Sequence, residues 1–224
     1  MTAAVISESL YTRLLDLACG AFLLAAVVVL WRRGLAAIVR TFALQGIALA
    51  AVAALLGVHE RRWDLLSVAV GIGLLRAGAL PYLMRRALAT GTEDDETRPV
   101  VNVAASLLTA AALTLLAYAV ARPLVALDPT PATRALPVGL SVVLIGFFVL
   151  ATRRHAPAQV VGFLLLDNGI TATAFLAASG VPLIVELGVS FDLLLAVLVL
   201  HILTTRMRAA FGTTDIDDLR ELHD

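Results

Sequence analysis

The chain has 224 residues, of which 60% are apolar and only 15% are charged, and its mean hydropathy is +0.94. A soluble globular domain typically carries about 25% charged residues, so this composition excludes soluble enzymes and indicates a membrane protein. The net charge is zero and all 17 basic residues are arginine, which leaves no basic surface for nucleic acid. The one cysteine, Cys19, is predicted to be a buried thiol, because a single cysteine supports neither a disulfide framework nor a cysteine metal cluster.

Seven apolar segments follow one another along the chain. A helix that crosses a hydrocarbon core about 30 Å thick needs about 20 apolar residues. Division at the clusters of Arg, Asp and Pro predicts spans near 15–31, 35–58, 65–84, 100–121, 136–152, 158–179 and 182–205, of which the first and fifth are short. The predicted fold is therefore an all-α, polytopic membrane helix bundle of about seven transmembrane helices. Its abundant Ala, Gly, Ser and Thr favour close helix contacts.

Arginine counts in the connecting segments predict the orientation of the chain. Short, positively charged loops stay in the cytoplasm, and the connections on one side contain five arginines against ten on the other. We therefore expect a multi-pass protein of the cell membrane with its amino terminus outside and its carboxyl terminus in the cytoplasm. We divide the chain into a four-helix region (1–134), a three-helix region (135–210) and an acidic cytoplasmic tail (211–224).

Three charged residues are predicted to lie deep in the membrane, where each costs about 2.5–3.5 kcal/mol on insertion scales. Arg76 lies about 13 Å from the cytoplasmic end of its segment, and Pro81 leaves a backbone carbonyl one turn earlier without its helical donor. Asp167 lies about 15 Å and Asp192 about 21 Å from the inner ends of their segments. We expect Arg76 to form an ion pair with one of these two acids.

The seventh segment carries further titratable groups on either side of Asp192, namely Glu186 and His201. On an ideal helix Glu186 lies about 120° from Asp192, and His201 about 180° from it, so neighbouring helices or water must join the steps of any proton path. Two interpretations stay open. Either this central layer carries protons, or Arg76 pairs with an acid only to hold the bundle together.

The remaining polar residues form no catalytic motif. Asp16 and Arg40 lie near predicted segment ends, where long or flexible side chains reach the interface. His59 and Glu60 are not followed by the second histidine of a zinc-protease helix, and no glycine-rich phosphate loop precedes a helix. His201 is the one histidine expected inside the membrane, which does not suffice for a bis-histidine haem. We expect no catalytic residue, cofactor or metal in this chain.

The carboxyl-terminal third, from Thr152 to Leu222, contains the sequence TRRHAPAQVVGFLLLDNGITATAFLAASGVPLIVELGVSFDLLLAVLVLHILTTRM and then FGTTDIDDLREL. This stretch resembles hydrogenase-4 component E, a family whose last three helices are similar to the K subunit of respiratory complex I and the C subunit of Mrp-type sodium/proton antiporters. The resemblance implies a non-catalytic membrane subunit of a group 4 nickel-iron hydrogenase complex of the formate-hydrogenlyase type. Its expected partners are antiporter-like membrane subunits, a membrane anchor subunit and hydrogenase arm subunits, which would hold the nickel-iron and iron-sulfur centres.

The resemblance also assigns roles to particular residues. In the K subunit a membrane-embedded glutamate on each of the last two helices serves proton transfer, and an arginine-bearing cytoplasmic loop precedes the first of them. Asp167 corresponds to the first acid, Arg153 and Arg154 match the loop, and either Glu186 or Asp192 stands for the second acid. The predicted proton relay therefore consists of Asp167, Asp192, Glu186, Arg76 and His201.

Other functions stay open beside this one. The chain would serve as a structural scaffold if its small-residue faces only join neighbouring subunits. It would be a subunit of an Mrp-like cation/proton antiporter if it has no redox partners. A stand-alone transporter is disfavoured, because the sequence shows no pair of broken helices.

Overall fold

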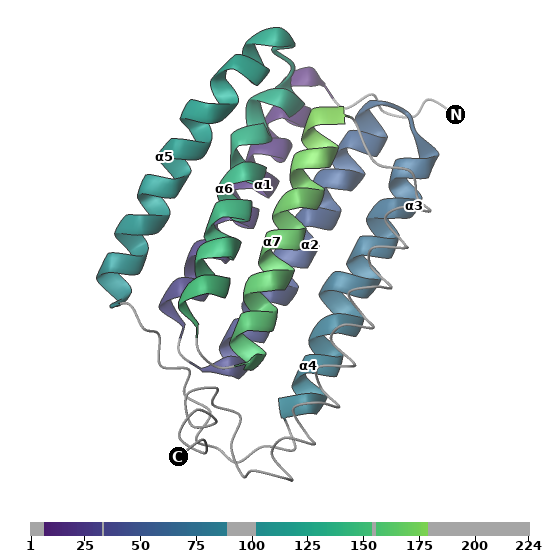
Figure 1. The fold of residues 1–224 in the computed structure, drawn as a ribbon. Coiled ribbons are helices and arrows are strands. Elements are labelled where there is room, and N and C mark those ends of the chain that lie inside the picture. Colours follow the sequence, from purple (N-terminus) through teal and green to yellow (C-terminus); the bar gives the residue numbers. More distant parts are fainter. Residues whose placement is uncertain (1–6, 33, 89–101, 154–155, 179–224) are drawn as a thin grey trace, which may run out of the picture.

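The computed structural model describes residues 7–32, 34–88, 102–153 and 156–178, and the regular structure in these ranges is all helical (Figure 1). The elements are α1 (Glu8–Trp31), α2 (Leu35–His59), α3 (Trp63–Ile72), the π-helical stretch η1 (Gly73–Ala79), α4 (Leu80–Leu88), α5 (Val103–Leu127), α6 (Pro131–Thr152) and α7 (Ala156–Ala178). α3, η1 and α4 form one continuous helix. Six helices in this part of the chain are long and apolar enough to cross a membrane. The all-α bundle is thus confirmed over six of the predicted segments, and the seventh, 182–205, lies outside the described residues.

The described helices pack side by side with alternating direction (Figure 1). α5, α6 and α7 form one row, α1 and α2 pack against α6 and α7, and the long helix of α3, η1 and α4 packs against α2. α1 and α6 end at the same end of the bundle at which α2 and α7 begin. We call this the Trp31 end, and the opposite end, where α1 begins and α2 ends, the Tyr11 end.

Glycines bring α6 and α7 into direct backbone contact. A Cβ at Gly162 of α7 would lie 2.6 Å from the Leu150 nitrogen of α6, and a Cβ at Gly169 would lie 2.5 Å from the Val143 nitrogen. The two glycines are seven residues apart and therefore share one face of α7. This contact, which the abundance of small residues predicted in general terms, fixes how α7 presents its other face to α2.

Two helices begin several residues before the start that the sequence predicted. α1 begins at Glu8 and not near residue 15, and α6 begins at Pro131 and not near residue 136. At the start of α6 the Thr130 side chain accepts from the Thr133 N–H, and the Thr133 hydroxyl accepts from the Thr130 N–H. This reciprocal cap satisfies backbone groups at the helix start and thereby fixes the start of α6 at Pro131.

Candidate functional site

The site is built around a π-helical turn that carries Arg76. The N–H of Leu80 donates to the carbonyl of Leu75, five residues earlier, and Pro81 follows with no N–H of its own. The carbonyl one turn before Pro81, which was predicted to lack its helical donor, therefore lies in a π-helical turn. Such widened turns recur at functional positions in proteins. Arg76 is completely buried, at 0% exposure.

α2 approaches this turn without an intervening side chain. A Cβ at Gly46 would lie 2.8 Å from the carbonyl carbon of Arg76 and 2.9 Å from the Ala77 nitrogen, closer than real Cβ contacts allow. Gly46 thus permits backbone contact between α2 and η1. The contact holds the base of the Arg76 side chain next to α2 while its guanidinium extends to α7.

Three side chains of α7 receive the guanidinium. Arg76 Nη1 lies 2.6 Å from Asp167 Oδ2 and donates to Asn168 Oδ1 at 2.5 Å. Arg76 Nη2 donates to Thr171 Oγ1 at 3.0 Å. Arginine suits this position because its planar fork of donors serves several acceptors at once. The expected ion pair is therefore formed, with Asp167 as the acid.

Two neutral amide side chains connect this cluster to α2. Asn168 Nδ2 donates to Gln45 Oε1 at 3.0 Å, and both side chains are 1% exposed. The Nε2 of Gln45 is buried and has no hydrogen-bond partner within the described ranges. Together, Gln45, Arg76, Asp167, Asn168 and Thr171 form what we call the polar layer, which joins α2, η1 and α7.

The sequence reasoning missed two members of this layer, Gln45 and Thr171. A signal for Gln45 was present, since an amide in the apolar run ALQGIAL needs a partner in a membrane. No comparable signal marked Thr171, because a threonine in a membrane helix commonly donates to its own backbone, as Thr41 and Thr173 do.

The polar layer has the parts needed to hold and release a proton. The Asp167 side chain is 13% exposed, whereas the Arg76 side chain is 0% exposed. An adjacent guanidinium favours the charged carboxylate and an apolar environment disfavours it, so a change in their separation changes the protonation of the acid. The described residues contain no group of His, Cys, Asp and Glu suited to a metal ion.

The other predicted site residues divide into two groups. Asp16 and Arg40 are exposed on the surface of α1 and α2. Arg40 lies near the start of α2, as expected, whereas Asp16 lies eight residues inside α1, because that helix begins at Glu8. The remaining predicted relay residues and one loop arginine lie outside the described residues: Glu186, Asp192, His201 and Arg154. The approach of a second acid to the polar layer therefore stays a prediction.

Arg153, the other predicted loop arginine, caps a helix. It is 4% exposed, and its Nη2 donates to the carbonyl oxygens of Val29, Leu30 and Arg32 at 3.2, 3.4 and 3.3 Å. These carbonyls belong to the end of α1, where no N–H of the helix remains to bond them. Burial lowers the pKa of the Arg153 guanidinium. The guanidinium faces the negative end of the α1 dipole, which stabilises its positive charge and so opposes the effect of burial. The end of α6 is thereby fixed to the end of α1.

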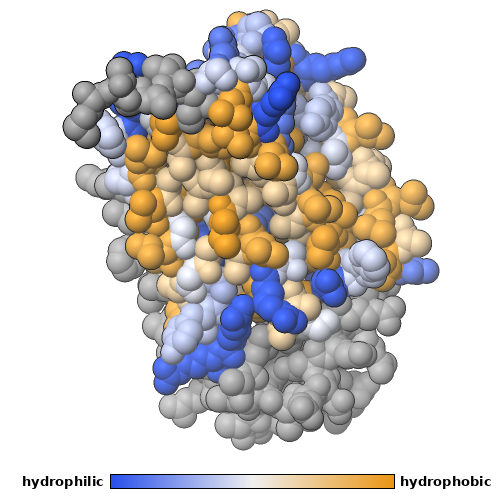
Figure 2. Space-filling model, turned by 180° about the vertical axis from the view of Figure 1, so that it is seen from behind, coloured by the Kyte–Doolittle hydropathy of each residue, from blue (hydrophilic) through white to orange (hydrophobic). Residues whose placement is uncertain are grey.

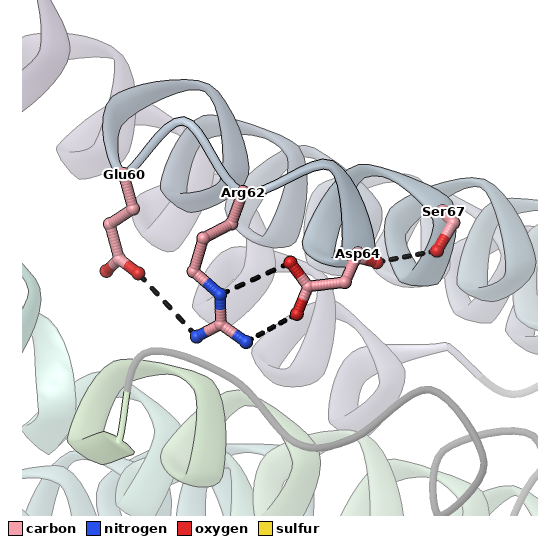
Figure 3. Close-up of polar contacts among 4 residues, drawn as sticks. All are labelled: Glu60, Arg62, Asp64 and Ser67. Carbon is pink, nitrogen blue, oxygen red and sulfur yellow. Dashed lines mark hydrogen bonds and ion pairs between the residues drawn. The ribbon is translucent and has the colours of Figure 1, made fainter.

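A second arginine–carboxylate cluster lies at the Tyr11 end, between α2 and α3 (Figure 3). Arg62 Nη2 lies 2.5 Å from Asp64 Oδ2, and Arg62 Nη1 lies 3.9 Å from Glu60 Oε2. The hydrogen bond from Arg62 to Asp64 raises the pKa of the guanidinium. The Ser67 hydroxyl donates to the backbone carbonyl of Asp64 at 2.6 Å. The cluster is open to solvent, so it orders the start of α3 and forms no enclosed site.

Comparison with known proteins gives one extensive match and several partial ones. The chain is 49% identical over 219 residues to the uncharacterized protein Rv0085 of Mycobacterium tuberculosis, and the alignment covers 97% of this chain and 100% of that protein. It is 28% identical over 143 residues to hydrogenase-4 component E of Escherichia coli K12 and, to the same extent, of Shigella flexneri; these alignments cover 64% of this chain and 66% of those proteins.

No family model matches the chain, and no solved structure matches it significantly. The similarity to hydrogenase-4 component E agrees with the resemblance seen in the sequence, but it is distant and partial. The match to Rv0085 extends over the whole length of that protein at nearly half identity. The chain therefore belongs to the same family as the uncharacterized mycobacterial protein Rv0085.

Proposed function

We propose that the chain is a non-catalytic integral membrane subunit of a hydrogenase-like complex, in which the polar layer takes part in proton translocation or relay. The observation that carries this proposal is the buried pair of Arg76 and Asp167, with nitrogen and oxygen 2.6 Å apart in membrane-spanning helices. Charged residues in such positions are costly and typically belong to ion or proton pathways. The similarity to hydrogenase-4 component E supports the assignment to a complex of that kind.

The proposal gives each part a role. Asp167 is the proton-carrying group, and Arg76 sets whether its charged form is favoured. Asn168 holds the guanidinium in place through its hydrogen bond, and Gln45 in turn fixes the Asn168 amide. The second acid is Glu186 or Asp192, with His201 nearer the end of the path. The nickel-iron and iron-sulfur centres belong to partner subunits, and antiporter-like subunits and a membrane anchor are the expected neighbours.

Isolation of the intact complex tests the assignment to it. The tagged chain is purified in mild detergent, and the co-eluting proteins are identified by mass spectrometry. Recovery of nickel-iron hydrogenase and antiporter-like subunits supports the proposal. Recovery of antiporter subunits alone favours an Mrp-like cation/proton antiporter, whose expression would raise sodium resistance. Recovery of the chain by itself contradicts both the hydrogenase-like complex and the antiporter.

Substitution of the acid tests the relay in that complex. Asp167→Asn removes the titrating group but keeps the size of the side chain, so proton pumping in inverted vesicles is expected to fall more than the hydrogenase reaction. Asp167→Glu is expected to keep part of the pumping. Asp16→Asn, a change of an exposed acid on α1, is the matched control and should leave both activities unchanged. Equal loss of both activities in Asp167→Asn, with the complex assembled, contradicts a relay.

A structural scaffold is the second candidate, and one observation favours it. The same ion pair joins η1 to α7, which the sequence places 91 positions apart, and so stabilises the bundle without moving protons. The double variant Arg76→Met with Asp167→Leu distinguishes the two functions, because an apolar pair of similar size can replace a buried ion pair without loss of stability. A scaffold keeps its coupled activity in this variant, whereas a relay assembles and loses it.

A further inference from the structure

An apolar groove runs between α1 and α2 on the face of the bundle that turns away from α7 (Figure 2). Its volume is about 830 Å³, and the residues that line it include Leu17, Leu24 and Ala21 of α1 and Leu44, Ile47 and Ala51 of α2. The leucines and the isoleucine are more than half exposed. In a membrane this groove is filled by hydrocarbon or by another helix, because no water is available to fill it.

The polar demands inside the groove are already met. Thr41 lines it, but its hydroxyl donates to the Ala37 carbonyl of its own helix at 2.9 Å. On α1 the lining extends from Leu14 to Arg32, about 27 Å at 1.5 Å per residue. A ligand in the groove therefore needs long apolar chains and no hydrogen-bonding groups until it reaches the end of the groove.

Two arginines lie close together at the Trp31 end of the groove. Arg32 is itself part of the lining, and Arg40 stands one turn before Leu44 on the same face of α2. Both are exposed, and neither side chain forms an ion pair or hydrogen bond within the described part of the chain. Side chains of a helix lean toward its amino terminus, so Arg40 leans toward Arg32.

We propose that this groove binds an anionic phospholipid, with its acyl chains along α1 and α2 and its phosphate between Arg32 and Arg40. Charge complementarity favours a lipid over a helix. A helix would have to bring its own acid to this depth, whereas anionic headgroups lie at the level of arginines that flank a membrane span. Trp31, which is 66% exposed on the same face as Leu24, adds the aromatic contact common at the headgroup level. Lipid binding in this groove is independent of the proposed function.

Trp31 also gives the experiment its signal. The sequence contains two tryptophans, Trp31 and Trp63, and Trp63 lies at the Tyr11 end, so a Trp63→Phe variant reports on Trp31 alone. The full chain is reconstituted in vesicles that contain bromine-labelled phosphatidylglycerol or bromine-labelled phosphatidylcholine, and Trp31 fluorescence is measured. We expect phosphatidylglycerol to occupy the site with a preference of about fivefold for each arginine.

Removal of the two arginine charges in the Trp63→Phe variant tests whether the lipid phosphate binds between them. Arg32→Gln together with Arg40→Gln is expected to abolish the preference for phosphatidylglycerol without reducing quenching by phosphatidylcholine. Arg122→Gln, which removes an exposed arginine from α5, is the matched control and should leave the preference unchanged. Equal quenching by both lipids in the unsubstituted chain, or a preference that survives in the double variant, overturns the proposal. If neither lipid quenches Trp31, a protein helix fills the groove and the proposal is again wrong.

Discussion

The molecule contains two arginine–aspartate pairs of nearly equal length in opposite surroundings. Arg76 and Asp167 lie 2.6 Å apart in the polar layer, with side-chain exposures of 0% and 13%. Arg62 and Asp64 lie 2.5 Å apart at the turn between α2 and α3, with exposures of 40% and 54%. The distance alone therefore says little about the energy. What differs is the medium, because water screens the second pair and is largely excluded from the first.

The two pairs also differ in what they hold together. Arg62 and Asp64 are neighbours in the sequence, so their contact constrains only the first turn of α3. Arg76 reaches across to α7, and its bonds to Asn168 and Thr171 add to the ion pair. A buried pair of this kind is difficult to break on one side, since the remaining charge stays in an apolar environment.

The largest expected effect follows from breaking the buried pair on one side. Asp167→Leu removes the carboxylate that lies 2.6 Å from the buried Arg76 guanidinium and is expected to reduce the free energy of unfolding by about 3–5 kcal/mol. Unfolding of the purified chain by sodium dodecyl sulfate, followed by circular dichroism, measures the loss. The double variant with Arg76→Met should recover most of it, because the buried guanidinium is then removed together with the carboxylate. A double variant as unstable as the single one would show that the neutral bonds of the layer, and not the charges, determine its energy.

Arg153 provides an intermediate case, a buried arginine that donates to backbone carbonyls at the end of α1. Arg153→Gln removes the donor shared by Val29, Leu30 and Arg32 at the end of α1. We expect a loss of about 1.5–3 kcal/mol, the range for hydrogen bonds that involve a charged group. The same detergent titration measures it, with Arg134→Gln on the surface of α6 as the control. A loss as large as that of Asp167→Leu would show that the bonds of Arg153 to the end of α1 contribute as much as the ion pair of the polar layer.

Gly46 tests how far the polar layer depends on its backbone support. Gly46→Ala places a methyl group 2.8 Å from the Arg76 carbonyl carbon, so α2 and η1 must separate. Overpacking of this kind costs about 1–3 kcal/mol. Gly20→Ala on α1, where a Cβ meets no atom within 4 Å, is the matched control and should be neutral or slightly stabilising. If both substitutions behave alike, the contact between the two helices is not tight.

Only some of the differences between the buried and the exposed ion pair could be predicted from the sequence. The depth of Arg76 in an apolar segment predicted a buried ion pair, because an unpaired charge there is too costly. Depth did not distinguish Asp167 from Asp192, since it gives the level of a residue and not the face of the helix on which it lies. The face of α7 is determined by its glycine contacts with α6, which involve residues such as Gly169 and Val143 that carry no charge signal.

The neutral members of the polar layer were harder to predict for a related reason. Gln45 bonds to Asn168 across 123 positions, and Thr171 bonds to Arg76 across 95, so both contacts depend on how α7 packs beside α2 and η1. Arg153 was recognised as a loop residue from the family resemblance, but its bond to Val29 bridges 124 positions. Contacts over such separations depend on helix packing, whereas the spans themselves depend on local hydrophobicity.

The exposed pair is expected to give the smallest effect, and its outcome decides what the contrast means. Arg62→Ala removes the bonds to Asp64 and Glu60, but exposed ion pairs gain little because solvent screens them and the side chains lose freedom. We expect the midpoint of detergent unfolding to stay within the error of the measurement, at low and at high salt. A clear loss that disappears in high salt would show that screening is weaker at this turn than its exposure indicates. A loss as large as that of Asp167→Leu would mean that burial does not separate the two pairs, and the energy of the polar layer would then have to be sought in its hydrogen bonds to Asn168 and Thr171.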